Sequence, residues 1–563
     1  MKRLSLLLIL VAVLFSLSLG LRGRGGGDQP ADEAASPPEN AGTPSDTAAG
    51  GPEFGDWLVQ NISAEPAHLN PLLSTGDAST SYMGSFIFET LLEIDNETLE
   101  FEPHLAERWE VSEDHLTYTF YLRKDVRFSD GVALTAKDVR STYDLIMKTE
   151  NDTANLRNYL QDIENVEVLD NYTVRFHMKK PYFRHLLVLG AFDVYPGHIY
   201  SKGDFNNHPN NRNPIGSGPY VFREWDTQSR QIVLERNENY WGERGPLDRR
   251  VFRMIDDDNA AFQALERHDI DINEIPPEKW VRQAAKPKFE REFNKITPDS
   301  PLPGFLSRFN YIGWNMRKPQ FEDKRVRQAL CMLFDRQLII DEVWYGYGTV
   351  LTGSIYHKAP EYNQDVEPWP FDPERAKQLL TEAGWVDSDR DGTREKNGVK
   401  FEFELTYSTG VPEYNQLGAV YQEELRRAGI KMNLNPMEWA TFQERVHKRT
   451  FDACMLAWLT ALMPDPYQLW HSSQAETGSN YPGWKNEEVD RILDEARTEF
   501  DHKNRISMYH RFHELQHEEQ PYLFLYARPG LLALDKRFHG VELYPGGIDP
   551  LEWWVPKSMQ RHK

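Results

Sequence analysis

The segment from Ala106 to Tyr143 constrains the fold of this chain most, because it predicts a strand, a turn and a capped helix in direct succession. Large side chains occupy every second position from Tyr118 to Leu122, which is the period of a half-buried strand. Ser129–Gly131 has the composition of a turn. Thr135 stands where a helix N-cap belongs, with Asp138 three residues later as its capping-box partner. The segment therefore predicts structural scaffold and carries no catalytic pattern.

The length and charge of the chain limit the classes of protein to which it can belong. With 563 residues it is long enough for two or more lobes, and its 40% hydrophobic and 27% charged residues are typical of a globular protein. Its formal net charge is −23, and the first 53 residues contribute only −2 of it. Because a protein that binds nucleic acid needs a basic surface to neutralise phosphates, this charge argues against a nucleic-acid partner.

The chain has two cysteines, Cys331 and Cys454. Two cysteines allow one disulfide but no disulfide framework. Both lie in apolar runs with the pattern of a helix or a strand, so we expect two buried free thiols.

The N-terminal residues predict export. Residues 1–20 combine Lys2 and Arg3, an apolar run and small residues at a cleavage position, as in a signal peptide. An uncleaved membrane anchor is the alternative interpretation. Residues 21–53 contain hardly any large apolar side chain, which predicts a disordered linker. We therefore expect a periplasmic or extracytoplasmic protein. It is not expected to be a cysteine-linked lipoprotein, because no cysteine lies near the cleavage position.

The remainder of the chain alternates between strand and helix patterns. Ser81–Leu92 has helical periodicity, and a strand at 251–255, a helix at 259–267 and a strand at 270–275 predict a right-handed crossover with parallel pairing. Further strands are expected at 401–407, 430–435 and 451–458, and further helices at 415–428, 440–448, 487–499 and 503–519. This alternation predicts an α/β fold with several lobes.

Three motifs carry a resemblance to a known family. The pattern A-x7-D-x2-TYTFYLRKDVRFSDG, followed by T-A-x-DV, begins at Ala106. EPAHLNP stands at 65–71, and PIGSGPY stands at 214–220. Together they closely resemble the signatures of bacterial extracellular solute-binding proteins, family 5, which bind oligopeptides, dipeptides or nickel for ABC transporters. The resemblance covers nearly all of 54–563.

The resemblance implies a fold and a domain order. The expected fold is the two-lobed α/β periplasmic binding protein type II, with a hinged cleft and an additional inserted α+β domain. The expected segments are the signal peptide (1–20), the linker (21–53), lobe I (54–90), the inserted domain (91–213), lobe I again (214–310), lobe II (311–528) and the return to lobe I (529–563).

The resemblance also places the ligand site. Trp439 and Trp458 have the spacing of the two tryptophans that wall ligand side-chain pockets in peptide-binding members, and the backbone at Leu459 and Thr460 would pair with a peptide as an added strand. Tyr82 is the expected contact from lobe I. The alternative interpretation is that both tryptophans are core residues.

One position departs from the family pattern. Where peptide-binding members place an aspartate for the amino terminus of the ligand, this chain has Ala461. An unpaired ammonium group in a closed site is costly. Either Asp465 supplies the charge from a shifted loop, or the ligand has no free amine.

An acidic segment follows the spacing of a calcium loop. Oxygen-bearing residues occupy its positions 1, 3, 5, 7 and 9: Asp387, Asp389, Asp391, Thr393 and Glu395. Gly398 stands at position 12, where a bidentate glutamate would belong. A structural calcium site and a plain acidic turn are the two interpretations. No other cofactor is required.

The helix near residue 515 contains a literal H-E-x-x-H motif, which is the zinc-protease pattern. His513 and His517 share a helix face with Glu514 between them, but no recognisable third ligand motif follows. The chain has no G-x-S-x-G elbow, no Walker loop and no dinucleotide fingerprint. A zinc metallopeptidase is therefore the minor alternative.

The function that the resemblance implies is capture without reaction. We expect a monomer that takes a peptide into a closing cleft, shifts toward its closed form and delivers the ligand to an ABC permease and ATPase complex in the cytoplasmic membrane. A binder of another solute with the same fold, an oligosaccharide or chelated nickel, is the alternative. A sensory role is not separable from transport by sequence.

Overall fold

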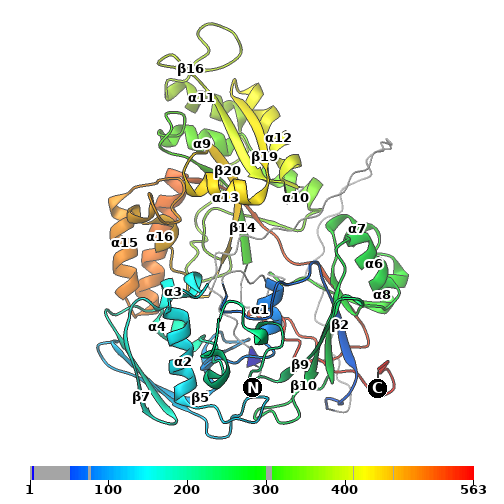
Figure 1. The fold of residues 1–563 in the computed structure, drawn as a ribbon. Coiled ribbons are helices and arrows are strands. Elements are labelled where there is room, and N and C mark those ends of the chain that lie inside the picture. Colours follow the sequence, from blue (N-terminus) through cyan, green and yellow to red (C-terminus); the bar gives the residue numbers. More distant parts are fainter. Residues whose placement is uncertain are drawn as a thin grey trace. The chain divides into compact units, whose positions relative to one another are not determined.

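The computed structural model describes residues 3–4, 51–73, 78–299, 307–409, 411, 413–460 and 462–562. The described chain divides into two compact units. The first unit holds residues up to 299 together with 529–562, and the second holds 307–528. Apart from residues 3–4, the predicted signal peptide lies outside the described residues, as does most of the predicted linker, so those two predictions stay predictions. Figure 1 labels the elements.

A mixed seven-stranded sheet forms the centre of the first unit, in the order β13-β22-β12-β2-β11-β10-β9. Its strands are β2 (Trp57–Ile62), β9 (Tyr220–Asp226), β10 (Gln231–Arg236), β11 (Arg249–Met254), β12 (Ile272–Glu274), β13 (Phe293–Ile296) and β22 (Leu532–Asp535). Both β11 and β12 pair in parallel with β2, and α6 (Asp258–Glu266) connects them. The predicted parallel crossover is confirmed, with β2 inserted between its two strands.

The segment at 106–143 contributes two of the four strands of a second sheet in the first unit. The order is β5-β6-β8-β7, formed by β5 (Ala106–Val111), β6 (Thr117–Leu122), β7 (Ile163–Asp170) and β8 (Thr173–Met178). Helix α2 (Ala136–Met147) begins after Thr135, and the capping box with Asp138 is present. The strand, turn and capped helix predicted from the sequence are thus confirmed.

The predicted helix at Ser81–Leu92 is wrong beyond its first turns. Helix α1 (Ala78–Gly84) ends early, and Leu92 begins β3 (Leu92–Asp95). The main chain between them pairs elsewhere, since the carbonyls of Phe86 and Ile87 accept from the N–H groups of Tyr220 and Gly218, each at 2.9 Å. The segment is buried on all sides, so it has apolar residues at helical spacing although its carbonyls at 86 and 87 bond to distant residues instead of continuing the helix.

The other elements of the first unit surround these two sheets. They are β1 (Arg3–Leu4), β4 (Phe101–Pro103), α3 (Ala154–Leu160), α4 (His185–Gly190), α5 (Gly197–Tyr200), α7 (Pro277–Arg282) and α8 (Pro287–Glu292). Strands β1 and β4 both pair with β3.

The second unit is organised on a six-stranded sheet in the order β15-β21-β14-β20-β18-β19. Its strands are β14 (Ser307–Trp314), β15 (Thr349–Val350), β18 (Glu402–Ser408), β19 (Lys431–Met437), β20 (Ala453–Thr460) and β21 (Tyr522–Ala527). A separate hairpin joins β16 (Glu395–Lys396) to β17 (Val399–Lys400). The predicted strands at 401–407, 430–435 and 451–458 are confirmed, with shifts of one or two residues.

Eight α-helices of the second unit lie within the described residues. They are α9 (Lys324–Met332), α10 (Arg336–Val343), α11 (Pro373–Glu382), α12 (Glu413–Arg427), α13 (Trp439–His447), α14 (Tyr467–Trp470), α15 (Glu487–Thr498) and α16 (His502–Glu519). Of these, α12, α13, α15 and α16 match the four predicted spans to within two residues. Helices α15 and α16 pack against each other (Figure 1). Within the described residues, no helix combines the length and apolar character that crossing a membrane requires.

Both cysteines are free and buried in the second unit, as the sequence predicts. The thiol of Cys331 donates to the Gln520 side-chain oxygen at 3.1 Å. Burial raises the pKa of each thiol to about 12. The reactive thiolate form is therefore suppressed at neutral pH, and both residues act as packing groups.

Candidate functional site

The candidate site in the second unit is organised by the end of strand β20. Strand β14 pairs antiparallel with all of β20, from Ala453 to Thr460. In the described chain, β18 pairs with β20 only at Ala453 and Cys454. From Met455 onward, β20 therefore has no strand partner on its β18 side within the described residues. An extended chain that approached this edge would find main-chain groups in the geometry of a sheet.

Trp458 lies on this part of β20 and is held by an aromatic cluster. Its ring stacks on Tyr481, with centroids 5.9 Å apart and planes 18° apart, and its Nε1–H donates to the Tyr522 hydroxyl at 3.4 Å. The side chain is only 6% exposed. The core interpretation therefore describes most of this ring.

Trp439 is the more accessible of the two predicted tryptophans. It opens helix α13 and is half-buried, with its ring 5.6 Å from that of Phe442. The Glu438 carboxylate caps the helix by accepting from the N–H of Ala440 at 2.9 Å. Trp439 packs against the same apolar cluster that contains Trp458. The structure thus brings both predicted tryptophans to one side of the second unit.

Leu459 and Thr460 end β20 opposite the first residues of β14. The Thr460 hydroxyl donates to the Ser307 carbonyl at 3.0 Å, which fixes the end of the strand. Ala461, the position of the missing carboxylate, lies outside the described residues. The predicted role of this position therefore stays a prediction.

Asp465 is already engaged within the second unit. One of its oxygens lies 3.1 Å from Nε of Arg497, and the other accepts from the N–H of Tyr467 at 3.1 Å. The guanidinium of Arg497 also lies 4.3 Å from the centre of the Tyr467 ring. A ligand ammonium group would therefore have to compete with Arg497 for this carboxylate.

Tyr82 belongs to the first unit, in helix α1. Its hydroxyl donates to the Gln60 side-chain oxygen at 3.4 Å, and its ring packs edge-on against Phe86 and Phe252. Burial raises the pKa of this phenol. Tyr82 is thus a neutral, positioned hydroxyl, and its expected contact with ligand stays a prediction.

The H-E-x-x-H motif is built into the packing of α16. Nδ1 of His513 accepts from the N–H of Asn363 at 3.1 Å, so the neutral ring carries its proton on Nε2, which donates to the Thr352 hydroxyl at 2.9 Å. Burial lowers the pKa of His513 to about 3 and that of His517 to about 4. Glu514 forms an ion pair with Arg511 at 3.0 Å. Neither nitrogen of His513 has a lone pair free for a metal, so this geometry does not favour zinc.

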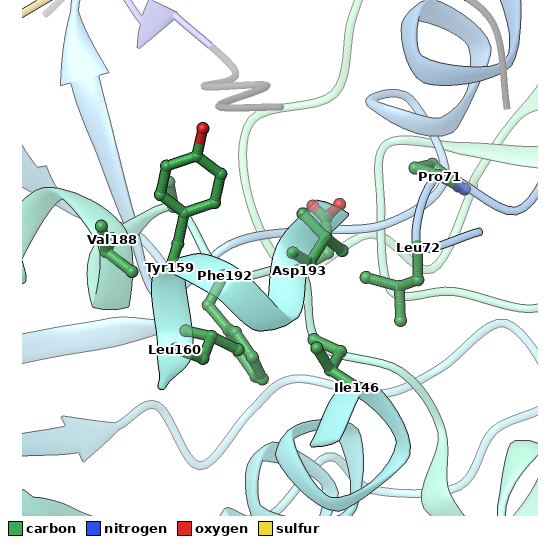
Figure 2. A pocket seen from close by; sticks show the side chains of 10 residues that line it. Pro71, Leu72, Ile146, Tyr159, Leu160, Val188, Phe192 and Asp193 are labelled. Carbon is green, nitrogen blue, oxygen red and sulfur yellow. The ribbon is translucent and has the colours of Figure 1, made fainter. Parts of the chain in front are cut away.

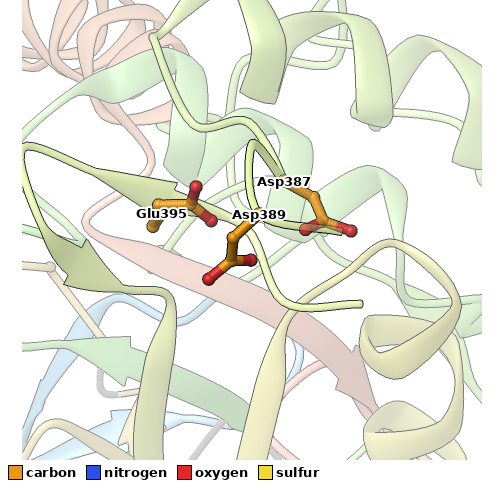
Figure 3. A group of neighbouring side chains, drawn as sticks. All are labelled: Asp387, Asp389 and Glu395. Atoms are coloured by element: carbon orange, nitrogen blue, oxygen red, sulfur yellow. The ribbon is translucent and has the colours of Figure 1, made fainter. Parts of the chain in front are cut away.

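The acidic loop gathers three carboxylates at the surface of the second unit. Asp387, Asp389 and Glu395 each place one oxygen within 4.8 Å of the others (Figure 3). The ammonium group of Lys400 lies 2.7 Å from Asp389 and 3.0 Å from Asp391. Hydrogen bonds from Lys400 lower the pKa of Asp389. The loop therefore holds an internal cation at the place where a calcium ion would bind.

The sequence did not reveal two residues that shape the candidate site. The Tyr481 ring stacks against Trp458, and Arg497 forms an ion pair with Asp465. Both lie more than 20 residues from their partners in the chain, and neither stands in a recognisable motif. Only the path of the chain around β20 brings them together.

Comparison with known proteins identifies the family. A family model described as "Bacterial extracellular solute-binding proteins, family 5 Middle" matches residues 100–481. The chain is 32% identical to the oligopeptide-binding protein AppA of Bacillus subtilis over 99% of this chain and all of that protein. It is 27% identical to the dipeptide-binding protein of Escherichia coli, over 83% of this chain and 88% of that protein.

Solved structures agree with the sequence relatives. The structure of Bacillus subtilis AppA in complex with a nonapeptide superposes with a TM-score of 0.75 at 30% identity, covering 90% of this chain and all of AppA. NikZ of Campylobacter jejuni in complex with Ni(L-His) superposes with a TM-score of 0.74 at 25% identity, covering 89% of this chain and 99% of NikZ. The predicted fold, a two-lobed α/β periplasmic binding protein, is thereby confirmed. The chain belongs to the bacterial extracellular solute-binding proteins of family 5.

Proposed function

We propose that this protein is the solute-binding component of an ABC importer and that its ligands are peptides. The observation that carries the proposal is the edge of β20 that faces β18. Beyond Cys454 this edge has no strand partner in the described chain, and Trp458 lies on the same stretch of β20. A peptide main chain added to this edge would gain hydrogen bonds that do not depend on its sequence. The similarity to AppA, which was solved with a nonapeptide, supports the same ligand class.

In this proposal the aromatic side chains accept ligand side chains without selecting one of them. Trp439, half-buried at the start of α13, offers a wall that any apolar side chain can cover. Leu459 and Thr460 contribute main-chain groups. Asp465 would bind a ligand amine only after releasing Arg497, and Tyr82 would contribute its hydroxyl from the first unit.

The proposed role is binding and delivery without chemical change. The exported monomer, carrying residues 1–20 as its signal or its anchor, would hand the ligand to a membrane permease and its ATPase. The buried, hydrogen-bonded ring of His513 supports a structural role for the H-E-x-x-H motif. We therefore propose that this chain is not an enzyme.

Ligand retention tests the proposal. We expect the purified protein, incubated with a pool of di- to nonapeptides and then desalted, to release peptides on denaturation that mass spectrometry can identify. Trp439→Ala should weaken binding of the best-retained peptide at least about tenfold, since burying a large apolar side chain is worth about 1.5–3 kcal/mol. Trp109→Ala is the matched control, because Trp109 is equally half-buried but lies on β5 of the first unit.

A second arm of this experiment examines the added strand. Methylating the backbone nitrogens of the retained peptide removes N–H donors without changing its side chains, so affinity should fall at least tenfold. Retention of a nickel chelate or an oligosaccharide in place of any peptide would contradict the proposed ligand class. Unchanged binding of the methylated peptide would contradict the added strand.

We also propose that the acidic loop binds calcium only weakly, because Lys400 competes for its carboxylates. We expect calorimetric titration with calcium chloride to give a dissociation constant of about 1 mM or weaker. Lys400→Met should tighten binding about tenfold, whereas Lys396→Met on the neighbouring strand should not. Equal calcium affinity in all three proteins would show that Lys400 does not control the site.

A further inference from the structure

A pocket in the first unit combines apolar walls with a single carboxylate. Its walls include Leu72, Ile146, Leu160, Val188 and Phe192, and Asp193 lines it as well. Its cavity volume is about 50 Å³ and it opens to solvent on one side, so only part of a bound hydrocarbon chain can lie inside it. Figure 2 shows Asp193 among these apolar side chains, between Leu72 and the residues of α3. No feature of the predicted peptide site includes any of these residues.

The backbone around Asp193 is fixed by its neighbours. Asp193 forms an isolated β-bridge with Thr90, and the N–H of Val194 donates to the Glu89 carbonyl at 2.9 Å. The N–H of Tyr195 donates to the Thr142 hydroxyl at 2.9 Å. The Asp193 side chain is thus held at the pocket wall by a rigid segment and does not lie on a surface loop.

Among the residues that the structure describes, none is a partner of the Asp193 carboxylate. The residue is only 9% exposed, and within the described chain its side chain neither accepts a hydrogen bond nor forms an ion pair. Two other buried carboxylates of the first unit show how such a group is compensated. Asp271 lies 2.9 Å from a guanidinium nitrogen of Arg537, and Glu89 accepts from the Tyr240 hydroxyl at 2.7 Å.

An uncompensated buried carboxylate raises the free energy of its charged form. Burial alone raises the pKa of Asp193 to about 7, so the group is near half ionisation at neutral pH. A cation placed in the pocket would restore the charged form, and the apolar walls would bury a hydrocarbon body attached to it. A hydrophobic ammonium ion meets both conditions together.

We propose that this pocket binds an organic ammonium ion, with its N–H groups donating to Asp193 and its hydrocarbon body against Leu72, Ile146 and Phe192. The chemical class is a protonated primary amine on an aliphatic or aromatic body. This inference does not rest on the proposed peptide function, because every residue in it belongs to the first unit and none to the β20 edge.

Calorimetric titration with hexylammonium chloride at pH 8 tests the inference, with hexanol as the uncharged probe of the same length. We expect hexylammonium to bind at least tenfold more tightly than hexanol. Asp193→Asn keeps the shape of the side chain and should weaken hexylammonium at least tenfold while leaving hexanol unchanged. Lowering the pH from 8 to 6 should weaken hexylammonium, because protonation removes the charge that recognises it.

Two further variants keep the result decisive. Asp144→Asn is the matched control: it alters an exposed carboxylate of α2 that pairs with Arg140, and it should leave hexylammonium binding unchanged. Val188→Trp adds a large side chain to the pocket wall and should abolish binding of both probes. This variant tests the location of binding even if Asp193→Asn does not fold. Equal affinities for hexylammonium and hexanol, or hexylammonium binding that survives Val188→Trp, would overturn the proposal. Peptide retention is a separate measurement. Its result neither supports nor contradicts the binding of hexylammonium at Asp193.

Discussion

Replacing Arg537 with alanine is expected to lower the free energy of unfolding of the first unit by about 3–5 kcal/mol, because it leaves buried carboxylates without their counter-charge. Arg537 is only 1% exposed and forms ion pairs with Asp56 and with Asp271, the latter at 2.9 Å. These residues come from the start of β2, from the approach to β12 and from the segment after β22. The guanidinium therefore joins three distant segments of the chain.

Amide hydrogen exchange measured by mass spectrometry on β2 and β22 would follow the stability of the first unit by itself, alongside urea unfolding of the whole chain. Arg426→Ala is the matched control. Its side chain is 70% exposed and pairs with Glu423 on the surface of α12, so we expect a change of less than about 1 kcal/mol. A loss of under about 1 kcal/mol in Arg537→Ala would contradict the assigned role.

Gly216→Ala is expected to destabilise the first unit by about 3 kcal/mol, because the added methyl group has nowhere to go. A Cβ at Gly216 would lie 2.0 Å from the carbonyl oxygen of Ile87. That neighbour is backbone, which cannot rotate aside as the end of a side chain can. The Gly216 carbonyl also accepts from the N–H of Ser129 at 2.8 Å, which ties this passage to the turn of the 106–143 segment.

The control for this substitution is Gly51→Ala, since a Cβ at Gly51 would meet nothing within 4 Å. We expect that variant to unfold within about 0.5 kcal/mol of the parent protein. Thermal and urea unfolding of both variants give the comparison. If Gly216→Ala were as stable as Gly51→Ala, the close approach of the two backbone segments would not be required.

The sequence predicts local structure best where its signals act over short distances. The capping box of Thr135 and Asp138, the strand at 117–122 and the four predicted helices of the second unit all follow from residues a few positions apart. The same local logic fails at Ser81–Leu92. There the apolar spacing reflects burial on every side, and the carbonyls of Phe86 and Ile87 accept from the N–H groups of residues 220 and 218 instead of continuing the helix.

In the candidate site, too, the sequence predicts which residues take part but not which contacts they make. Trp439 and Trp458 are recognisable from their motif, yet their accessibility is not, because Tyr481 and Tyr522 cover Trp458 from distant parts of the chain. Nor does the spacing of the acidic loop indicate that Lys400 lies among its carboxylates. The H-E-x-x-H motif is also ambiguous in sequence, since only the contacts of His513 with Asn363 and Thr352 show that both ring nitrogens are engaged.

The sequence by itself determined the family, the α/β alternation and the places where helices begin, because these depend on motifs, periodicity and caps that neighbouring residues specify. Only the tertiary structure decided which charged groups have partners. The sequence does not distinguish Asp465, Asp271 and Asp193 from one another. In the structure, Asp465 forms an ion pair with Arg497 and Asp271 forms one with Arg537. Asp193 instead lines a pocket that holds no cationic side chain of the described chain. Charge compensation acts through space between segments far apart in sequence, so it becomes visible only once the chain is folded.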